Sequence, residues 1–157
     1  MRSIDRLRTI EPFSYRRDPA VPAFPDDKPL VVFDGDCVLC SRFATFILER
    51  DPDAMFRMTT AQSPLGQALF QHYGLDRRDF ETNLVLDGGR PYVKLDSVVI
   101  VGRRLAGPWR AAAMLRLLPR ALSDWIYDRI ARNRYALFGR HDRCMMPPAQ
   151  WQDRFLI

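Results

Sequence analysis

Two cysteines separated by two residues, Cys37 and Cys40, are the strongest chemical signal in this sequence. They follow a short apolar run that ends at Phe33, and two carboxylates, Asp34 and Asp36, lie between that run and the first cysteine. The stretch VVFDGDCVLC allows three kinds of chemistry: a redox dithiol, half of a metal site, or the Asp-x-Asp of a phosphatase. The elements around it must decide among the three.

The cysteines lie at a predicted junction between a strand and a helix. Residues 30–33 are apolar and mostly β-branched, which is typical of a strand buried on both faces. Apolar residues recur at helical spacing from Cys40 until Asp51 and Pro52, where the helix should end. Cys37 then lies one turn before Cys40, with Cα atoms ~5–6 Å apart, a separation that suits a disulfide.

The segments after this junction predict an α/β fold. Their order is strand, helix, strand, strand and helix, followed by two further helices. The predicted strands span residues 56–59, 83–86 and 92–94, with Asp87-Gly88-Gly89 as the turn between the last two. The predicted helices span residues 64–74, with Ser63 as the N-cap, 96–107, 111–118 and 122–133. With the first strand and helix, this order predicts a thioredoxin-like mixed β-sheet flanked by helices, with extra C-terminal helices.

Chain length and proline content predict one domain with an arm. The 157 residues suffice for a single core. Residues 1–28 contain four prolines and little periodicity, so we expect an extended N-terminal arm there and the domain in residues 29–157.

The positive charge of the chain is concentrated in its C-terminal third. Residues 101–157 carry 11 basic and 4 acidic side chains. These arginines alternate with apolar residues at helical spacing, and Leu122, Trp125, Ile126 and Ile130 share one face. We therefore expect the arginines on solvent-facing sides of helices and predict no specific binding of nucleic acid.

Cysteine content and hydropathy predict a reducing compartment. Three cysteines are too few for a disulfide scaffold, and a close pair in a reducing compartment is catalytic or metal-binding more often than structural. The N-terminal segment lacks the apolar core of a signal peptide, and no apolar run approaches the ~20 residues of a membrane span. We expect a cytoplasmic protein without membrane insertion.

The dithiol interpretation assigns different roles to the two cysteines. At the start of a helix, Cys37 should be exposed, and its thiolate should be stabilised by free backbone N–H groups and the helix dipole. A pKa of ~6–8 would suit attack at neutral pH. Cys40 would be shielded and would resolve the mixed disulfide, and no organic cofactor is expected. Asp34 either accepts the Cys40 proton or only caps the turn, and Asp36 should point to solvent.

Two alternatives from other classes remain open. Cys37, Cys40, His141 and Cys144 form two pairs of soft ligands that would suit a zinc-stabilised binding module. Cys144 is otherwise not expected to form a stable disulfide with either motif cysteine.

The run VVFDGDCVL also resembles the first motif of Mg²⁺-dependent haloacid-dehalogenase-type phosphatases. Those enzymes need a lysine and a later acidic pair. This chain has two lysines, Lys28 and Lys94, and no adjacent acidic pair after residue 27.

The chain resembles the DCC family of thiol-disulfide oxidoreductases, thioredoxin-like proteins named for a DxxCxxC motif. Residues 34–40, DGDCVLC, match the DGxCxLC form of that motif, and the similarity extends to the run NRYALFGRHDRCMMP at residues 133–147. The resemblance implies dithiol–disulfide exchange, with Cys37 and Cys40 as the redox pair and Asp34 as the accompanying acid.

One departure from thioredoxin concerns the substrate. Thr82 and Asn83 stand before the third strand, where thioredoxin has a proline that shapes the groove for a substrate backbone. Substrates would be protein thiols and disulfides or a small thiol such as glutathione.

Overall fold

The computed structural model describes residues 2–156 except positions 79, 81, 106 and 144, with side chains from position 5 onward. Within these residues, the strands are β1 (Leu30–Phe33), β2 (Arg57–Thr60), β3 (Leu84–Asp87) and β4 (Arg90–Val93). The helices are α1 (Arg2–Thr9), α2 (Val38–Glu49), α3 (Pro64–His72), α4 (Lys94–Arg104) and α5 (Arg120–Phe138), and the 3-10 helices are η1 (Ser14–Arg17), η2 (Gly107–Leu117) and η3 (Ala149–Arg154).

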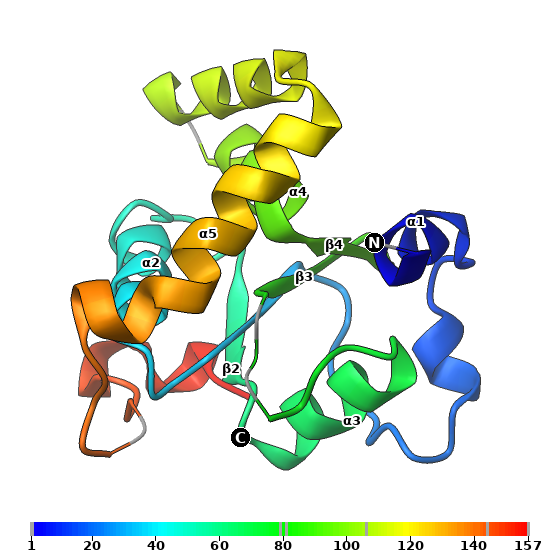
Figure 1. The fold of residues 1–157 in the computed structure, drawn as a ribbon. Helices are drawn as coiled ribbons and strands as arrows, with labels where there is room; N and C mark the ends of the chain where they lie inside the picture. Colours follow the sequence, from blue (N-terminus) through cyan, green and yellow to red (C-terminus); the bar gives the residue numbers. More distant parts are fainter. Residues whose placement is uncertain (1, 79, 81, 106, 144, 157) are drawn as a thin grey trace.

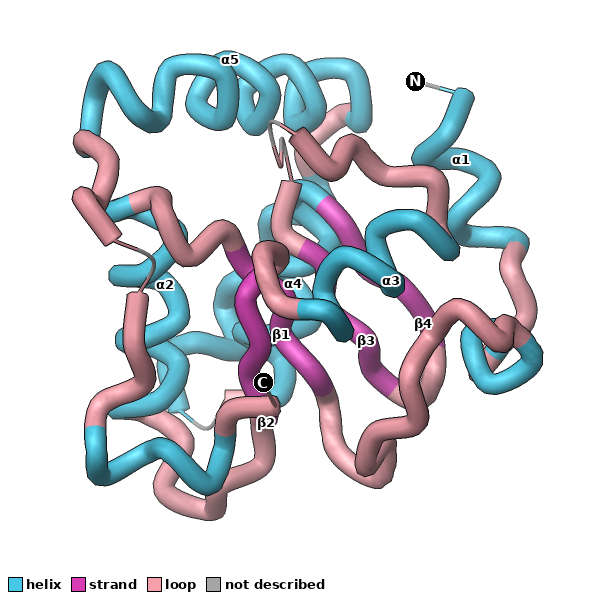
Figure 2. The backbone as a smooth tube through the Cα atoms, turned by 90° about the horizontal axis from the view of Figure 1, so that it is seen from below, coloured by secondary structure: helices cyan, strands magenta, loops and turns pink. Residues whose placement is uncertain are grey.

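The strands form one mixed sheet in the order β2-β1-β3-β4 (Figure 2). β1 and β2 run parallel, with Val31 opposite Met58, because α2 provides the crossover between them. β3 is antiparallel to both of its neighbours and forms a hairpin with β4. This arrangement is a thioredoxin-like α/β fold, so the predicted fold class is confirmed, and each strand begins within two residues of its predicted start.

Helices cover both faces of the sheet, and the central strand feeds both cores. Leu30 and Val32 of β1 pack into the cluster that includes residues of α1 and α3. Val31 and Phe33 point the other way, into the cluster with residues of α2 and α4. Since side chains alternate along a strand, a strand buried on both faces must be apolar at every position. All four residues of β1 are indeed buried.

Local sequence signals place the ends of several elements. The Ser63 hydroxyl accepts a hydrogen bond from the Gly66 backbone N–H at 3.0 Å, and Pro64 occupies the first turn of α3. Gly88 and Gly89 both have positive φ in the turn between β3 and β4, a conformation that favours glycine. The predicted cap and hairpin turn are therefore confirmed.

The N-terminal arm is not extended throughout, which corrects the prediction. Residues 2–9 form α1, and Leu7 on that helix is buried. Proline first occurs at Pro12, so nothing in residues 2–9 prevents a helix. The Phe13 backbone N–H donates to the Gly89 carbonyl at 2.9 Å, which fixes the arm to the β3–β4 turn. The domain boundary at residue 28 stays a prediction.

The predicted helix over residues 111–118 is instead a 3-10 helix that begins earlier, at Gly107. This segment, η2, packs closely on α4. A Cβ atom at Gly102 would lie 2.6 Å from the Trp109 carbonyl oxygen and 2.5 Å from the Ala112 Cβ, so the contact depends on glycine.

Helix α5 is longer than the predicted 122–133, contacts α2 and α4 (Figure 1), and lies along one edge of the molecule in Figure 2. Its arginines do not all face solvent as predicted, because Arg134 is buried. Arg154, in η3, is buried as well. Among the described residues, no helix is both long and apolar enough to cross a membrane.

Candidate active site

Cys37 lies at the junction of β1 and α2, as the sequence predicts. It is the N-cap residue of α2, and its sulfur accepts a hydrogen bond from the Cys40 backbone N–H at an N–S distance of 3.4 Å. An N-cap position carries the partial positive charge of the helix dipole and unpaired backbone donors. Both stabilise a negative charge on the Cys37 sulfur. The two cysteines are free thiols in this structure.

Burial of Cys37 contradicts the predicted exposure. Its relative accessibility is 0%, and that of Cys40 is 8%, so both sulfurs lie in the core cluster between the sheet and α2. A position at the start of a helix predicts that Cys37 is open to solvent. A segment distant in the sequence covers it instead.

The covering segment follows α5, and we call residues 139–143 and 145 the cover segment. Its backbone runs along the DGDC loop: the His141 N–H donates to the Asp36 carbonyl at 2.8 Å, and the Met145 N–H donates to the Gly35 carbonyl at 2.9 Å. Arg140 forms a β-bridge with Cys37. This pairing of backbones explains why the first motif cysteine has no exposed surface.

The surroundings shift the pKa values of the two thiols in opposite directions. The pKa of Cys37 is lowered to about 6, first by the hydrogen bond from the Cys40 thiol, then by the Cys40 backbone N–H and the charge of Arg134, against burial and the charge of Asp34. The same thiol–thiol hydrogen bond, burial and Asp34 raise the pKa of Cys40. Near neutral pH, the favoured state is therefore a Cys37 thiolate beside a Cys40 thiol.

The Asp34 carboxylate is the polar centre beneath the loop. One oxygen accepts hydrogen bonds from the Asp36 backbone N–H at 3.0 Å and the Gln62 amide at 2.7 Å. The other accepts from Arg134 Nη2 at 3.3 Å and from the Tyr135 hydroxyl. Asp34 therefore does cap the turn, as one of its two predicted roles required, and it also binds α5.

Sequence reasoning missed Arg134, Tyr135 and Gln62. Asp34 and Arg134 are 100 residues apart, and each is at least 95% buried. The run that contains Arg134 and Tyr135 carried part of the family resemblance, but helical spacing alone assigned its arginines to solvent. Gln62 lies two residues after the end of β2, so the parallel pairing of β1 and β2 would have placed it near Asp34 at the same sheet edge.

Asp36 lies at the surface, as predicted. Its side chain is partly exposed, and one oxygen lies 3.7 Å from Arg140 Nη2. The Arg140 guanidinium also lies over the Tyr135 ring, 4.8 Å from its centroid. The charge of Asp36 is thus balanced by the cover segment rather than directed at the thiols.

The loop before β3 is also covered by α5. The Asn83 backbone N–H donates to the Tyr127 hydroxyl at 3.3 Å, and the Thr82 hydroxyl accepts from the Lys94 backbone N–H at 2.8 Å. In thioredoxin this loop shapes the groove that binds a substrate backbone, as noted above. Here the Tyr127 hydroxyl accepts the hydrogen bond of the Asn83 backbone N–H, so that N–H is already paired within the protein.

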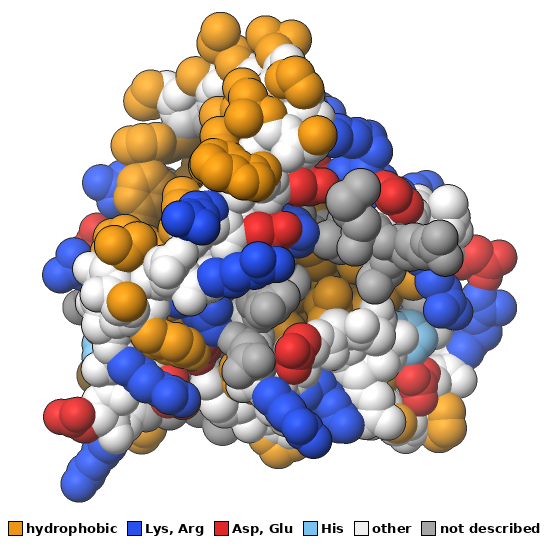
Figure 3. Space-filling model, in the orientation of Figure 1, with side chains coloured by type: hydrophobic (Ala, Val, Ile, Leu, Met, Phe, Trp, Pro, Cys, Tyr) orange, Lys and Arg blue, Asp and Glu red, His pale blue; other side chains and the backbone are white. Residues whose placement is uncertain are grey.

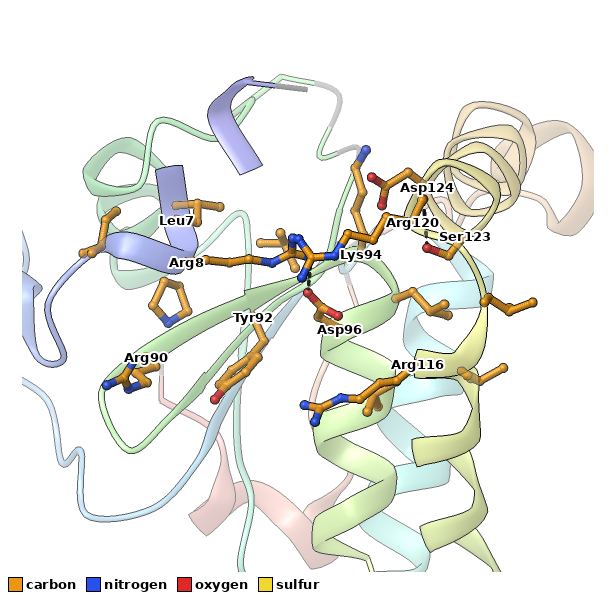
Figure 4. Close-up of a pocket in the computed structure, with 17 residues that line it drawn as sticks. Leu7, Arg8, Arg90, Tyr92, Lys94, Asp96, Arg116, Arg120, Ser123 and Asp124 are labelled. Atoms are coloured by element: carbon orange, nitrogen blue, oxygen red, sulfur yellow. Dashed lines mark hydrogen bonds and ion pairs between the residues drawn. The ribbon is translucent and has the colours of Figure 1, made fainter. Parts of the chain in front are cut away.

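A cavity of about 360 Å³ lies elsewhere, between β4 and the ends of α1, α4 and α5 (Figure 4). An ion pair of 2.6 Å between Arg8 and Asp96 crosses it, with Tyr92 and Arg116 on its walls. Neither motif cysteine lines this cavity. The candidate site therefore rests on the cysteines and their polar neighbours.

The two alternative chemistries gain no support. The backbone of His141 does lie beside Asp36, but Cys144, the fourth proposed zinc ligand, lies outside the described residues. Within the described residues, no group of three His, Cys, Asp or Glu is placed to hold a metal ion.

For a phosphatase, a lysine would have to face Asp34. Lys28 instead donates to the Ala54 carbonyl and Lys94 pairs with Asp128.

Fold and motif together define a thioredoxin-like protein with a CxxC pair at its first strand–helix junction. The family model of DCC1-like thiol-disulfide oxidoreductases matches residues 31–140, so the chain belongs to that family, and the predicted resemblance is confirmed. Membership supports a general thiol-disulfide oxidoreductase role.

Two curated proteins are similar over most of the chain. The uncharacterized protein YuxK of Bacillus subtilis (strain 168) is 37% identical over 127 residues, which cover 81% of this chain and 93% of YuxK. A chloroplastic DCC family protein of Arabidopsis thaliana is 31% identical over 120 residues, which cover 76% of this chain and 70% of the plant protein. No solved structure matches the chain significantly.

Proposed function

We propose that this protein is an enzyme of thiol–disulfide exchange that uses Cys37 and Cys40 as its dithiol. The observation that carries the proposal is the position of the Cys37 sulfur: at the N-terminus of α2, hydrogen-bonded by Cys40, with its pKa lowered to about 6. The thiolate is the attacking species in exchange, and its neighbour is kept protonated.

In the reductive direction, the reaction has two displacements. The Cys37 thiolate attacks one sulfur of a substrate disulfide, forms a mixed disulfide and releases the other substrate sulfur as a thiolate. Cys40 then loses its proton and attacks the Cys37 sulfur, which forms the Cys37–Cys40 disulfide and releases the second substrate thiol. The substrate is reduced by two electrons and the enzyme is oxidised, so an external thiol must reduce the pair again.

Asp34 has two parts in this scheme. Its hydrogen bonds hold the DGDC loop against α5 through Arg134, whose charge favours the Cys37 thiolate. The charge of Asp34 raises the pKa of Cys40, so the carboxylate lies close enough to interact with that thiol. We therefore propose Asp34 as the acceptor of the Cys40 proton.

Access to Cys37 constrains the substrate. The attacked sulfur has to come within bonding distance of a fully buried atom, so the cover segment must move during each turnover. Protein and small-molecule thiols or disulfides remain the proposed substrates. Nothing in the comparisons supports glutathione in particular, and it stays a prediction, as does a cytoplasmic location, since the plant relative is named chloroplastic.

The test is a trapping experiment with dithionitrobenzoate, a small aromatic disulfide, in a background that carries Cys144→Ser. Reduced Cys40→Ser should accumulate a mixed disulfide with thionitrobenzoate at Cys37, visible by mass spectrometry. Cys37→Ser should neither trap the probe nor turn over, and the parent with both motif cysteines should release both halves of the probe.

Other outcomes have definite meanings. Trapping by Cys37→Ser and not by Cys40→Ser would reverse the roles of the two cysteines. Unchanged exchange in both variants would reject the dithiol mechanism.

A further inference from the structure

Helix α5 carries its apolar side chains on the outside of the molecule. Leu122, Trp125, Ile126, Ile130 and Leu137 recur at the spacing of one helix face, and all five are exposed, Trp125 by 63%. A surface helix of a globular protein normally turns such a face toward the core. The prediction that Leu122, Trp125, Ile126 and Ile130 share one face is confirmed, and Leu137 lies on it too, but that face is the outer one.

The inner face of α5 explains this orientation. The buried residues of the helix are Ser123, Ala131 and Arg134, and Tyr127 bonds the loop before β3. The helix is held by polar contacts to Asp34 and Asn83, so the apolar face is left without a partner inside the protein. Its exposure therefore follows from how the candidate active site is built.

The preceding 3-10 helix extends this face. Met114 and Leu117 of η2 are 67% and 80% exposed. Figure 3 shows hydrophobic side chains gathered over η2 and the first part of α5. We call the surface formed by these two residues and the five of α5 the outer face. Continuous apolar surface of this kind marks an interaction site.

Charge around the outer face has one sign. Along residues 103–140, the exposed charged side chains in the described part of the chain are all arginines, of which Arg104 pairs with Asp87 and Arg140 lies 3.7 Å from Asp36: Arg103, Arg104, Arg110, Arg116, Arg120, Arg129, Arg132 and Arg140. The two acidic residues in this range, Asp124 and Asp128, are partly buried, and Asp128 pairs with Lys94 at 2.7 Å. A partner must therefore be apolar and anionic together.

A second copy of the chain does not meet that requirement. An isologous contact through the outer face would bring the arginines of one copy against those of the other, and like charges in a contact are unfavourable. An anionic lipid bilayer does meet it, because acyl chains accept the apolar side chains while headgroup phosphates pair with arginine. Trp125 is of the residue type enriched at the membrane–water interface.

We infer that the outer face docks on the surface of a membrane that contains anionic lipids, with α5 lying in the interface plane. The helix would not span the bilayer. Its inner face would continue to hold the DGDC loop, so membrane contact and dithiol chemistry would use opposite sides of one helix. This inference does not depend on the proposed function.

Vesicle co-sedimentation tests the apolar part. The full chain should bind to vesicles of equal parts phosphatidylcholine and phosphatidylglycerol. It should bind much less to vesicles of phosphatidylcholine alone. The double variant Leu117→Ser with Trp125→Ser should lose at least about tenfold in partitioning, because each serine removes apolar area from the interface. Met146 is as exposed as Leu117 but lies outside the outer face, so Met146→Ser is the matched control and should bind like the parent.

The charged part is tested by reversing two arginines. Arg129→Glu with Arg132→Glu should weaken binding to the mixed vesicles at least about tenfold, and added salt should weaken binding of the parent. Arg77→Glu with Arg78→Glu gives the same change in net charge on exposed residues outside the outer face and should bind more tightly than the first pair. Circular dichroism and urea unfolding verify that each variant is folded.

Three results would overturn the inference. They are no binding to the mixed vesicles, equal binding to phosphatidylcholine alone, or full binding by the Leu117/Trp125 variant. A dimer of the parent that is lost in that variant would instead identify a second copy as the occupant.

Discussion

Two buried ion pairs connect the C-terminal third of the chain to the sheet, and their surroundings differ. Asp34 pairs with Arg134 and Asp51 pairs with Arg154, and each of the four residues is at most 7% exposed. Each carboxylate also accepts backbone N–H bonds, and each guanidinium also donates to a backbone carbonyl. In chemistry and burial the two pairs are closely matched.

Only one pair lies beside thiols. Asp51 follows the end of α2 and ties η3 to the residues just before β2 through the Phe56 carbonyl and N–H. Asp34 and Arg134 lie at the other end of α2, where both contribute to the shifted pKa values of Cys37 and Cys40. The comparison shows that one kind of contact serves packing alone in one place and packing with electrostatics in the other.

The largest expected effect is common to both pairs. Arg134→Met and Arg154→Met should each lower the free energy of unfolding by about 3–5 kcal/mol, since each leaves a buried carboxylate without its cation. Urea unfolding measures this, with the exposed Arg132→Met as control, within about 0.5 kcal/mol of the parent. A loss of stability in only one of the two variants would show that the two pairs are not energetically equivalent.

Tyr135 distinguishes the Asp34–Arg134 pair from the Asp51–Arg154 pair, and its removal should lower the free energy of unfolding by a smaller amount. Its hydroxyl donates to Asp34, whereas Asp51 accepts hydrogen bonds from the Met55 and Phe56 backbone N–H groups and from Arg154. Tyr135→Phe removes one donor to a charged group while Arg134, Gln62 and the Asp36 N–H remain. We expect a loss of about 1–2 kcal/mol in the same unfolding experiment. No loss would indicate that the other three donors suffice to hold the carboxylate.

The smallest effect is the one specific to the cysteine site. Arg134→Met should raise the pKa of Cys37 from about 6, because a cation near the thiolate is lost, and Arg154→Met should leave it unchanged. Asp34→Asn should lower it, since that carboxylate opposes the thiolate. Thiolate absorbance against pH measures all three variants. Equal pKa shifts in the two arginine variants would show that the difference between the pairs is not electrostatic.

The pH dependence of exchange follows the same sign. In the parent, the Cys37 thiolate forms as pH rises through about 6, so the attack rate should increase over that range and then level off. In Arg134→Met the rise should lie at higher pH. A parent rate that keeps rising in proportion to hydroxide up to pH 8 would contradict a Cys37 pKa of about 6.

Local patterns in the sequence account for the features that depend on neighbouring residues. The apolar run before Asp34 predicts β1, the helical spacing of apolar residues from Cys40 places Cys37 at the start of α2, Ser63-Pro64 caps α3, and Asp87-Gly88-Gly89 predicts the hairpin. Each of these signals acts over a few residues through backbone conformation, capping and side-chain alternation. For that reason the order of elements, and with it the thioredoxin-like fold, could be predicted.

The surroundings of the cysteines come from segments that are distant in the sequence. Cys37 is buried by a segment about 100 residues away, and the arginine that faces Asp34 is equally distant. Periodicity finds the apolar face of α5 but cannot say which face turns inward. That choice depends on Asp34 and Asn83, whose polar contacts hold the helix by its polar side. Such contacts exist only once distant parts of the chain are packed together, so no local pattern records them.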